Sequence, residues 1–199
     1  MRVISGEAKS RRLYAVPGDT TRPITDRVKT SLFNILADRI EDARFLDLFA
    51  GTGGVGIEAL SRGAREAVFV EREPRALATI RRNLEVTGLA DYARVLRKDV
   101  FKFIVGYAGE PFDLVYVAPP QYKGLWAQTL EAMDGTALMA PDGLAVAQIH
   151  PKEYGPLTLT NLALTDQRKY GSTLLCFYAL RNTQSPRQDT GSPADWQSL

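Results

Sequence analysis

The part of the sequence that most constrains the fold is a glycine-rich turn at residues 47–56, which reads DLFAGTGGVG. It follows an apolar segment and precedes a stretch with helical spacing. Glycines permit a tight turn and allow backbone N–H groups to approach a ligand closely. The G-x-G-x-x-G pattern of Gly51, Gly53 and Gly56 therefore predicts a strand, turn and helix that bind a cofactor carrying an adenosine ribose.

Strand-like and helix-like segments alternate on both sides of this turn. The predicted strands are 43–48, 67–71, 93–97, 112–117 and 144–149, and the predicted helices between them are 55–62, 74–87, 100–107 and 123–132. Such alternation predicts βαβ units, and hence an α/β fold with a parallel sheet covered by helices on both faces. Two further strand-like runs, 159–165 and 173–180, predict an antiparallel hairpin at the sheet edge.

The chain ends differ in character from this central part. We expect residues 1–42 to form an N-terminal RNA-binding extension, residues 43–181 the α/β domain and residues 182–199 a disordered tail. Alternating apolar residues around Gly6 predict a hairpin at the start of the extension. Helical spacing from Val28 to Ile40 predicts a helix with Thr25 or Asp26 as its N-cap.

Composition excludes several classes of protein. The 45% hydrophobic and 24% charged residues are ordinary for a soluble globular chain. Cys176 is the only cysteine and His150 the only histidine, so neither an internal disulfide nor a structural zinc site is expected, and we predict no metal. There is no secretory leader pattern and no apolar run of membrane-spanning length, so a cytoplasmic protein is expected. No pattern indicates an oligomeric state.

Three acidic residues lie where the first three predicted strands end. Glu71 lies 20 residues after Gly51, the spacing expected of an acid that binds a ribose. A carboxylate at Asp47 would attract the cationic methionine part of S-adenosylmethionine and repel the pyrophosphate of a nicotinamide dinucleotide. Asp99 is placed to accept a hydrogen bond from an adenine amine. The alternative for each acid, and most strongly for Asp99, is a helix N-cap or a surface charge.

Several motifs in the sequence resemble those of a known protein family. The pattern Asp47-x-Phe49-x-Gly51-x-Gly53 resembles motif I of the class I, Rossmann-like methyltransferases. Seven further segments resemble the bacterial 16S rRNA guanine-N2 methyltransferases, the group that modifies guanine 966: 2–6 (RVISG), 11–13 (RRL), 21–23 (TRP), 26–28 (DRV), 32–36 (LFNIL), 56–64 (GIEALSRGA) and 169–173 (KYGST). The resemblance covers about residues 1–181 and leaves only the tail outside it.

The resemblance implies a fold, a cofactor and a substrate. The fold is a mostly parallel seven-stranded sheet with helices on both faces and an N-terminal hairpin-plus-helix extension. The cofactor is S-adenosylmethionine, and the substrate is the exocyclic N2 amine of a guanine in 16S rRNA or in the small ribosomal subunit. The implied cofactor-binding residues are Asp47, Phe49, Gly51, Gly53, Glu71 and Asp99.

The predicted catalytic loop follows the fourth strand and comprises Ala118, Pro119, Pro120, Gln121 and Tyr122. It resembles the Asp/Asn-Pro-Pro-Tyr/Phe motif of amino-methyltransferases. In that motif a side-chain oxygen accepts the N–H bonds of the amine, and the aromatic ring stacks on the flipped base. Here alanine replaces the acid or amide, and glutamine replaces the aromatic residue. We expect Gln121 Oε1 to act as the acceptor and Tyr122 as the stacking ring.

Basic residues are concentrated in the extension. Residues 1–30 contain seven basic and three acidic side chains, whereas the whole chain has a net charge of only +2. Such a basic segment suits RNA phosphates, and the alternative is a solvated surface. Arg22 precedes Pro23, which fixes the chain direction and could mount a phosphate clamp. The RNA-contact candidates are Lys9, Arg11, Arg12, Arg22 and Arg27.

Several alternatives stay open on the sequence alone. Ala118 favours a catalytically impaired RNA-binding module, or a methyltransferase redirected to another amine, because alanine supplies no acceptor for the N–H bonds. A nicotinamide-dependent oxidoreductase shares the glycine turn, although Asp47 argues against it. His150 follows the fifth strand, where it is a structural residue, a contact to the base edge or, less readily, a general base.

Overall fold

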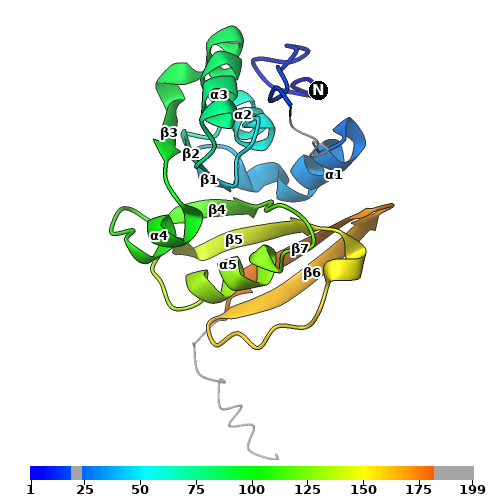
Figure 1. The fold of residues 1–199 in the computed structure, drawn as a ribbon, viewed down its shortest axis with the longest axis vertical. Coiled ribbons are helices and arrows are strands. Elements are labelled where there is room, and N and C mark those ends of the chain that lie inside the picture. The colour runs from blue at the N-terminus through cyan, green and yellow to red at the C-terminus, as the bar shows by residue number, and fades with distance from the viewer. Residues whose placement is uncertain (19–23, 182–199) are drawn as a thin grey trace, which may run out of the picture.

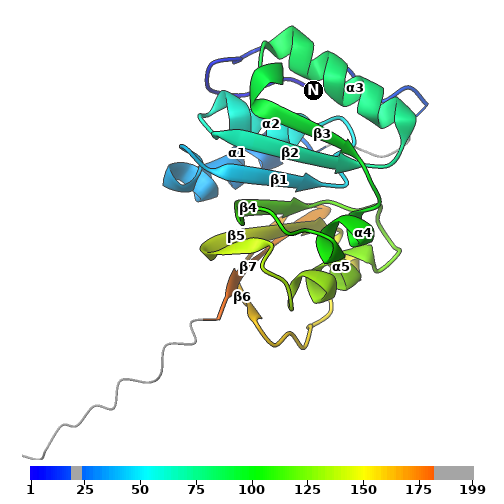
Figure 2. The same cartoon turned by 90° about the vertical axis from the view of Figure 1, so that its left-hand side faces the viewer.

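The computed structural model describes residues 1–18 and 24–181, and within them one sheet dominates. Its order is β3-β2-β1-β4-β5-β7-β6, as Figures 1 and 2 show. The five strands β1 to β5 run parallel, and β7 is antiparallel to both of its neighbours. The strands are β1 Arg44–Leu48, β2 Glu66–Glu71, β3 Ala93–Arg97, β4 Phe112–Val117, β5 Met139–Ile149, β6 Leu162–Tyr170 and β7 Thr173–Leu180.

Helices cover both faces of the sheet. They are α1 Asp26–Leu36, α2 Gly54–Ser61, α3 Pro74–Thr87, α4 Val100–Val105 and α5 Leu125–Met133, with short 3-10 turns at Ala37–Arg39, Ala90–Tyr92 and Pro151–Glu153. Helices α1, α2 and α3 pack on one face, and α4 and α5 on the other (Figure 2). A hydrophobic core fills each face. Successive strand residues point to opposite faces, so Phe45 packs in the core beneath α1, α2 and α3, and Leu46 packs in the core beneath α4 and α5. The predicted Rossmann-like α/β fold is therefore confirmed.

Some predicted boundaries were wrong. The first helix stops at Leu36, because Ala37 leaves the helical conformation with φ 27° and its N–H binds Phe33 O. Ile40 is nevertheless buried, in the segment after the helix. The fifth strand begins at Met139 rather than at Leu144 and includes Asp142-Gly143, beside an irregularity in its pairing with β4.

The predicted strand 159–165 begins later and extends further. Backbone N–H groups of Thr160, Asn161 and Leu162 donate to the side chain of Asp134, which follows α5. The first residues of the expected strand are therefore hydrogen-bonded to the C-terminal end of α5, and pairing with β7 begins at Leu162. The predicted hairpin at Tyr170-Gly171 is present, with β6 at the edge of the sheet.

We call residues 1–18 the N-terminal arm. The predicted hairpin appears there as a reversal with a single antiparallel bridge between Arg2 and Arg12 rather than as two strands. Gly6 has φ +81°, and a Cβ built on it would lie 1.6 Å from the carbonyl oxygen of Ser61, so the close approach requires glycine. Val3, Ala8 and Leu13 are buried in the same core as α1 and α2. The arm is thus packed onto the α/β unit.

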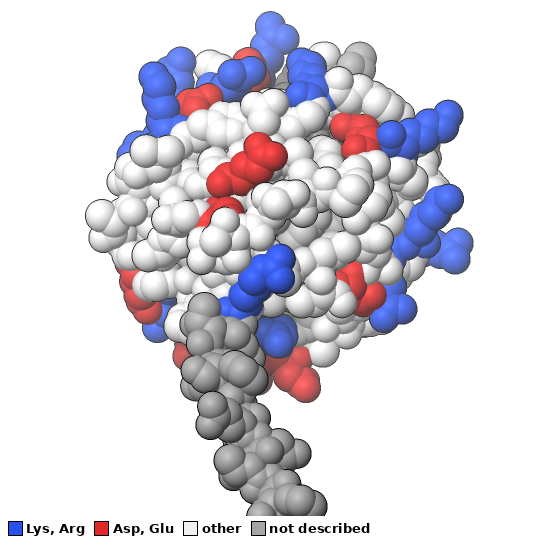
Figure 3. Space-filling model, turned by 90° about the horizontal axis from the view of Figure 1, so that it is seen from below, with Lys and Arg blue, Asp and Glu red and all other residues white. Residues whose placement is uncertain are grey.

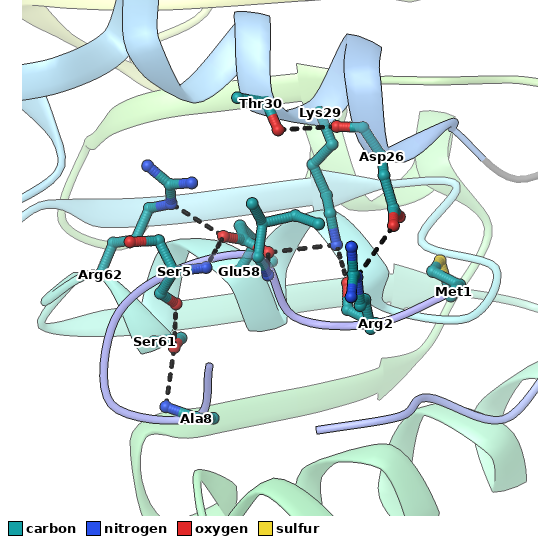
Figure 4. A network of polar contacts seen from close by, with 12 residues as sticks. Met1, Arg2, Ser5, Ala8, Asp26, Lys29, Thr30, Glu58, Ser61 and Arg62 are labelled. Carbon is teal, nitrogen blue, oxygen red and sulfur yellow. Dashed lines mark hydrogen bonds and ion pairs between the residues drawn. The ribbon is translucent and has the colours of Figure 1, made fainter. Parts of the chain in front are cut away.

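A buried ion pair fastens the arm to α1 and α2 (Figure 4). Lys29 Nζ lies 3.1 Å from Glu58 Oε2, and both side chains are fully inaccessible. Lys29 also donates to Arg2 O, while Ile4 N and Ser5 N donate to the Glu58 carboxylate. Burial lowers the pKa of Lys29, and the Glu58 charge opposes that shift. The pair therefore links three segments that are distant in the sequence.

Two further expectations concern the chain as a whole. In the described ranges 1–18 and 24–181, no helix is both long enough and apolar enough to cross a membrane. The predicted disordered tail, 182–199, lies outside the described residues.

Candidate active site at the carboxyl edge of the sheet

The glycine turn after β1 uses the left-handed backbone region three times. Phe49, Gly51 and Gly53 have φ values of 60°, 55° and 73°. A Cβ on Gly51 would meet only Phe49 O, at 3.9 Å, so the space beside this residue is open. A Cβ on Gly56 would lie 2.4 Å from the ring of Phe69, so this glycine lets α2 pack closely against β2. At Gly51 the turn thus presents backbone, with no side chain, at the sheet edge.

Asp47 lies beneath this turn and is almost completely buried, with 2% of its surface exposed. Its Oδ2 accepts a hydrogen bond from Gly56 N at 3.0 Å, which fixes the start of α2. Burial, and to a lesser degree the charge of Glu71, raise the pKa of Asp47 to about 8 against the opposing effect of the Gly56 hydrogen bond. Among the described residues, Oδ1 receives no hydrogen bond. A nearby cation would therefore favour ionisation of this carboxyl.

Glu71 ends β2 and holds the glycine turn against that strand. Gly51 N donates to its Oε2 at 3.0 Å. Arg72 N and Glu73 N donate to Oε1 at 2.8 and 3.0 Å. A carboxylate oxygen has two lone-pair sites, so Oε1 is fully engaged by these two donors and Oε2 retains one site for a hydroxyl donor. The sequence identified Glu71 as a ligand contact but did not reveal that it also positions the turn.

Asp99 follows β3 and is the N-cap of α4. Its Oδ1 accepts hydrogen bonds from Phe101 N and Lys102 N, both at 3.1 Å. The capping role that the sequence left as an alternative is therefore present. A role in contacting adenine stays a prediction, and the side chain is partly exposed at the same edge as Glu71.

The proline loop begins beside the glycine turn. Ala118 N donates to Leu48 O at 3.4 Å, because β4 pairs directly with β1. Pro119 is buried, whereas Pro120 and Gln121 are exposed. Tyr122 adopts φ 60° and is 65% exposed, so its ring is open to a stacking partner. The loop and the turn therefore share one edge of the sheet.

A glutamate that sequence reasoning missed holds this loop. Glu153 Oε2 accepts a hydrogen bond from Tyr122 N at 2.6 Å, and its Oε1 accepts one from His150 N at 3.3 Å. The available signal was the spacing of His150 and Glu153, which form a capping box around the 3-10 turn after β5. The carboxylate thus connects the proline loop to the end of β5.

His150 has structural partners of its own. Its Nδ1 accepts a hydrogen bond from Lys152 N at 3.2 Å, so that nitrogen is engaged. Its ring lies 5.4 Å from the ring of Tyr122. In β5, Gln148 Oε1 accepts a hydrogen bond from the Tyr116 hydroxyl at 2.6 Å. These contacts favour support of the loop over general-base chemistry.

The candidate RNA contacts are on the surface but are not all together. Lys9, Arg11 and Arg12 are exposed on the arm, and Arg27 is exposed on α1. Arg22 lies outside the described residues. Within residues 1–18 and 24–181, none of the four described candidates forms an ion pair, and no group of three or more His, Cys, Asp or Glu side chains is arranged to hold a metal.

Comparisons with known proteins agree with this arrangement. Residues 1–179 match the family described as Conserved hypothetical protein 95. YlbH of Bacillus subtilis is 39% identical over 184 residues, which cover 91% of this chain and 100% of YlbH. Ribosomal RNA small subunit methyltransferase D of Escherichia coli is 33% identical over 178 residues, covering 89% of each chain. The solved structure of yhhF from Escherichia coli, 33% identical, superposes with a TM-score of 0.80 over 90% of this chain and 97% of that one.

Proposed function

Because this chain belongs to the family described as Conserved hypothetical protein 95, we propose that it is an rRNA methyltransferase. More specifically, we propose that it transfers a methyl group from S-adenosylmethionine to the exocyclic N2 amine of a guanine in small-subunit rRNA. The similarity to ribosomal RNA small subunit methyltransferase D supports the rRNA substrate. The N-terminal motifs that resemble guanine-N2 methyltransferases support the choice of amine. A substrate of this kind would place the protein in the cytoplasm.

One observation carries the proposal: the glycine turn and the proline loop start side by side, joined by the Ala118 N to Leu48 O hydrogen bond of 3.4 Å. In an open parallel sheet, ligands bind at the carboxyl ends of the strands. Methyl transfer needs its two reactants in line and in contact, so two binding elements on adjacent strands suit it. Glu71 and Asp99, at the ends of β2 and β3, extend the same edge.

The residues around the turn suit the proposed cofactor. When bound, S-adenosylmethionine supplies an electrophilic methyl group on a positively charged sulfur. Glu71 Oε2 retains one lone-pair site for a ribose hydroxyl, and the open space beside Gly51 lets backbone approach the ligand. Asp47, buried and with one oxygen not hydrogen-bonded among the described residues, can neutralise the methionine amino group.

The proline loop would orient the amine. An amine attached to a base ring is a weak nucleophile because its lone pair is delocalised into the ring. Acceptors for its N–H bonds favour a pyramidal nitrogen whose lone pair is aimed at the methyl group. We propose that Gln121 Oε1 and the loop carbonyls accept those bonds, and that Tyr122 stacks on the base. The exposure of both side chains supports these roles.

The test is tritiated methyl transfer to small-subunit rRNA and to small ribosomal subunits, with RNA binding measured in parallel. We expect transfer that is mapped to the N2 of a single guanine. Binding without transfer would favour the second candidate, a non-catalytic RNA-binding module, which the alanine at position 118 specifically supports. Transfer to a different amine would retain the methyltransferase and reject the guanine.

A further inference from the structure

The N-terminal arm runs along α3 toward the candidate active site. Tyr14 N donates to Asn83 Oδ1 at 2.7 Å, and Asn83 Nδ2 donates back to Tyr14 O at 3.1 Å. Four residues further on, a Cβ built on Gly18 would lie 3.5 Å from Nη1 of Arg75, so the arm has reached the first turn of α3. That turn directly follows β2 at the carboxyl edge. Figure 1 shows the arm beside α2 and α3.

Two exposed arginines border the arm on α3. Arg75 and Arg82 are seven residues apart, so they lie on the same side of the helix about 10 Å apart along its axis. The Arg82 guanidinium stacks over Tyr14, with Cζ 3.5 Å from the ring centroid. Such stacking holds the guanidinium while leaving its N–H groups able to donate. Neither arginine forms an ion pair within the part of the chain that the structure describes.

The basic residues of the arm continue this row away from the site. Lys9, Arg11 and Arg12 are exposed before the arm reaches Tyr14. The exposed acids on these elements are fewer, namely Glu7 on the arm and Glu73 and Glu85 at the ends of α3. At the opposite end of the molecule, seen from below in Figure 3, positive and negative side chains are mixed and separated by uncharged surface. Positive charge is therefore aligned along the arm and α3.

We propose that Arg75, Arg82 and Tyr14 form a track for the RNA backbone that leads from the basic arm to the active-site edge. The inference rests on the proposed function, because it assigns to α3 a part in holding the same RNA substrate. A guanidinium fork matches a phosphate group with two parallel hydrogen bonds. The track would fix the direction in which the RNA enters, while the proline loop receives the base.

The experiment compares two variants of the full chain. The double variant Arg75→Gln/Arg82→Gln removes the track charges. The control Arg81→Gln removes an exposed arginine from the same helix, about a third of a turn away from the line of the other two. Binding to transcribed small-subunit rRNA is measured by filter retention from 50 to 200 mM KCl. Affinity for S-adenosylhomocysteine and the melting temperature report whether the fold is intact.

We expect the double variant to lose on the order of tenfold in RNA affinity near 0.1 M salt. The slope of log affinity against log salt concentration is negative, and its magnitude should decrease by about 1.4 to 1.8, which corresponds to two lost phosphate contacts. The control should keep the affinity and slope of the original protein, and all three should bind S-adenosylhomocysteine equally. If the double variant does not fold, each single variant should lower the slope by about half as much.

An unchanged salt dependence in the double variant, or an equal loss of RNA affinity in the control, would contradict the proposed track. These failures are distinct from failure of the proposed function. If the unaltered protein binds rRNA without methylating it, the enzymatic assignment fails while the track stands. If it methylates rRNA and the arginine variants bind and react normally, only the track fails.

Discussion

Replacing Asp47 with asparagine tests whether its buried carboxyl meets the amino group of the cofactor. The asparagine oxygen can still accept the hydrogen bond from Gly56 N, so the start of α2 should be retained. Only the ability to become negative is removed. Burial raises the pKa of Asp47 to about 8, so without ligand at pH 7 about one molecule in eleven is ionised. A cationic ligand must therefore displace a proton to form the pair.

The size of the effect follows from that pKa. Affinity for S-adenosylhomocysteine, which carries the same amino group, should rise about tenfold between pH 6 and pH 7, equivalent to about 1.4 kcal/mol. Binding at pH 7 should release about 0.9 proton per ligand, because Asp47 passes from almost fully protonated to ionised. In the Asp47→Asn variant both effects should disappear, and the affinity should be lower than that of the original protein at pH 8.

Isothermal titration calorimetry measures both quantities. The affinity is determined at pH 6, 6.5, 7 and 8 in two buffers of different ionisation enthalpy, and the difference in heat gives the number of protons released. The asparagine variant is the control for titration of the ligand itself. A flat affinity between pH 6 and 7 in the original protein, with no proton released, would show that Asp47 does not contact the amino group.

Four further predictions follow from the same contacts. Without ligand, the free energy of unfolding of the original protein, relative to that of Asp47→Asn, should fall by about 1.4 kcal/mol per pH unit as the pH rises from about 3.8 to about 8. The reason is that the folded state holds a proton on Asp47 in this range and the unfolded state does not. Urea titrations at several pH values measure this difference, and an equal pH dependence of the two proteins would contradict the prediction. Gln121→Ala should lower methyl transfer on the order of a hundredfold and Ala118→Asn should raise it, and unaltered single-turnover rates would remove the proposed acceptor role. Glu58→Gln should destabilise the fold by about 3–5 kcal/mol in denaturant titration, because it leaves Lys29 buried without an acidic partner. The control Arg62→Gln keeps the pair of Lys29 and Glu58 and should cost much less. Equal losses of stability in the two variants would contradict this prediction. RNA affinity of the unaltered protein should fall steeply from low to physiological salt, and a flat profile would reject the assignment of the basic arm.

The fold could be predicted because its signals are local. Apolar alternation and the glycine turn placed every strand of the parallel part and the hairpin at its edge. Two of the errors lie where a distant residue decides the structure. The Asp134 side chain accepts hydrogen bonds from the backbone of residues 160–162, so β6 begins later than predicted. No pattern in the sequence near these residues indicates that contact. The same holds for the arm, in which packing against Ser61 and Glu58 replaces regular strand pairing.

The candidate site was predictable in its residues but not in its connections. Motif spacing identified Asp47 and Glu71, yet their burial and their hydrogen bonds to the glycine turn depend on how three strands meet. Glu153 was missed because its two partners, Tyr122 and His150, come together only when β4 and β5 pair. The contact between Tyr14 and Arg82 joins residues 68 positions apart, and no local pattern reveals it.

A crystal structure with S-adenosylhomocysteine would show whether the cofactor and the base meet at the carboxyl edge of the sheet. We expect the adenosyl part to lie against the Gly51–Gly53 turn, with the ribose at Glu71 and the sulfur facing the loop that begins at Ala118. A ligand bound elsewhere, or with its sulfur directed away from the paired prolines, would contradict the proposed methyl transfer at this edge.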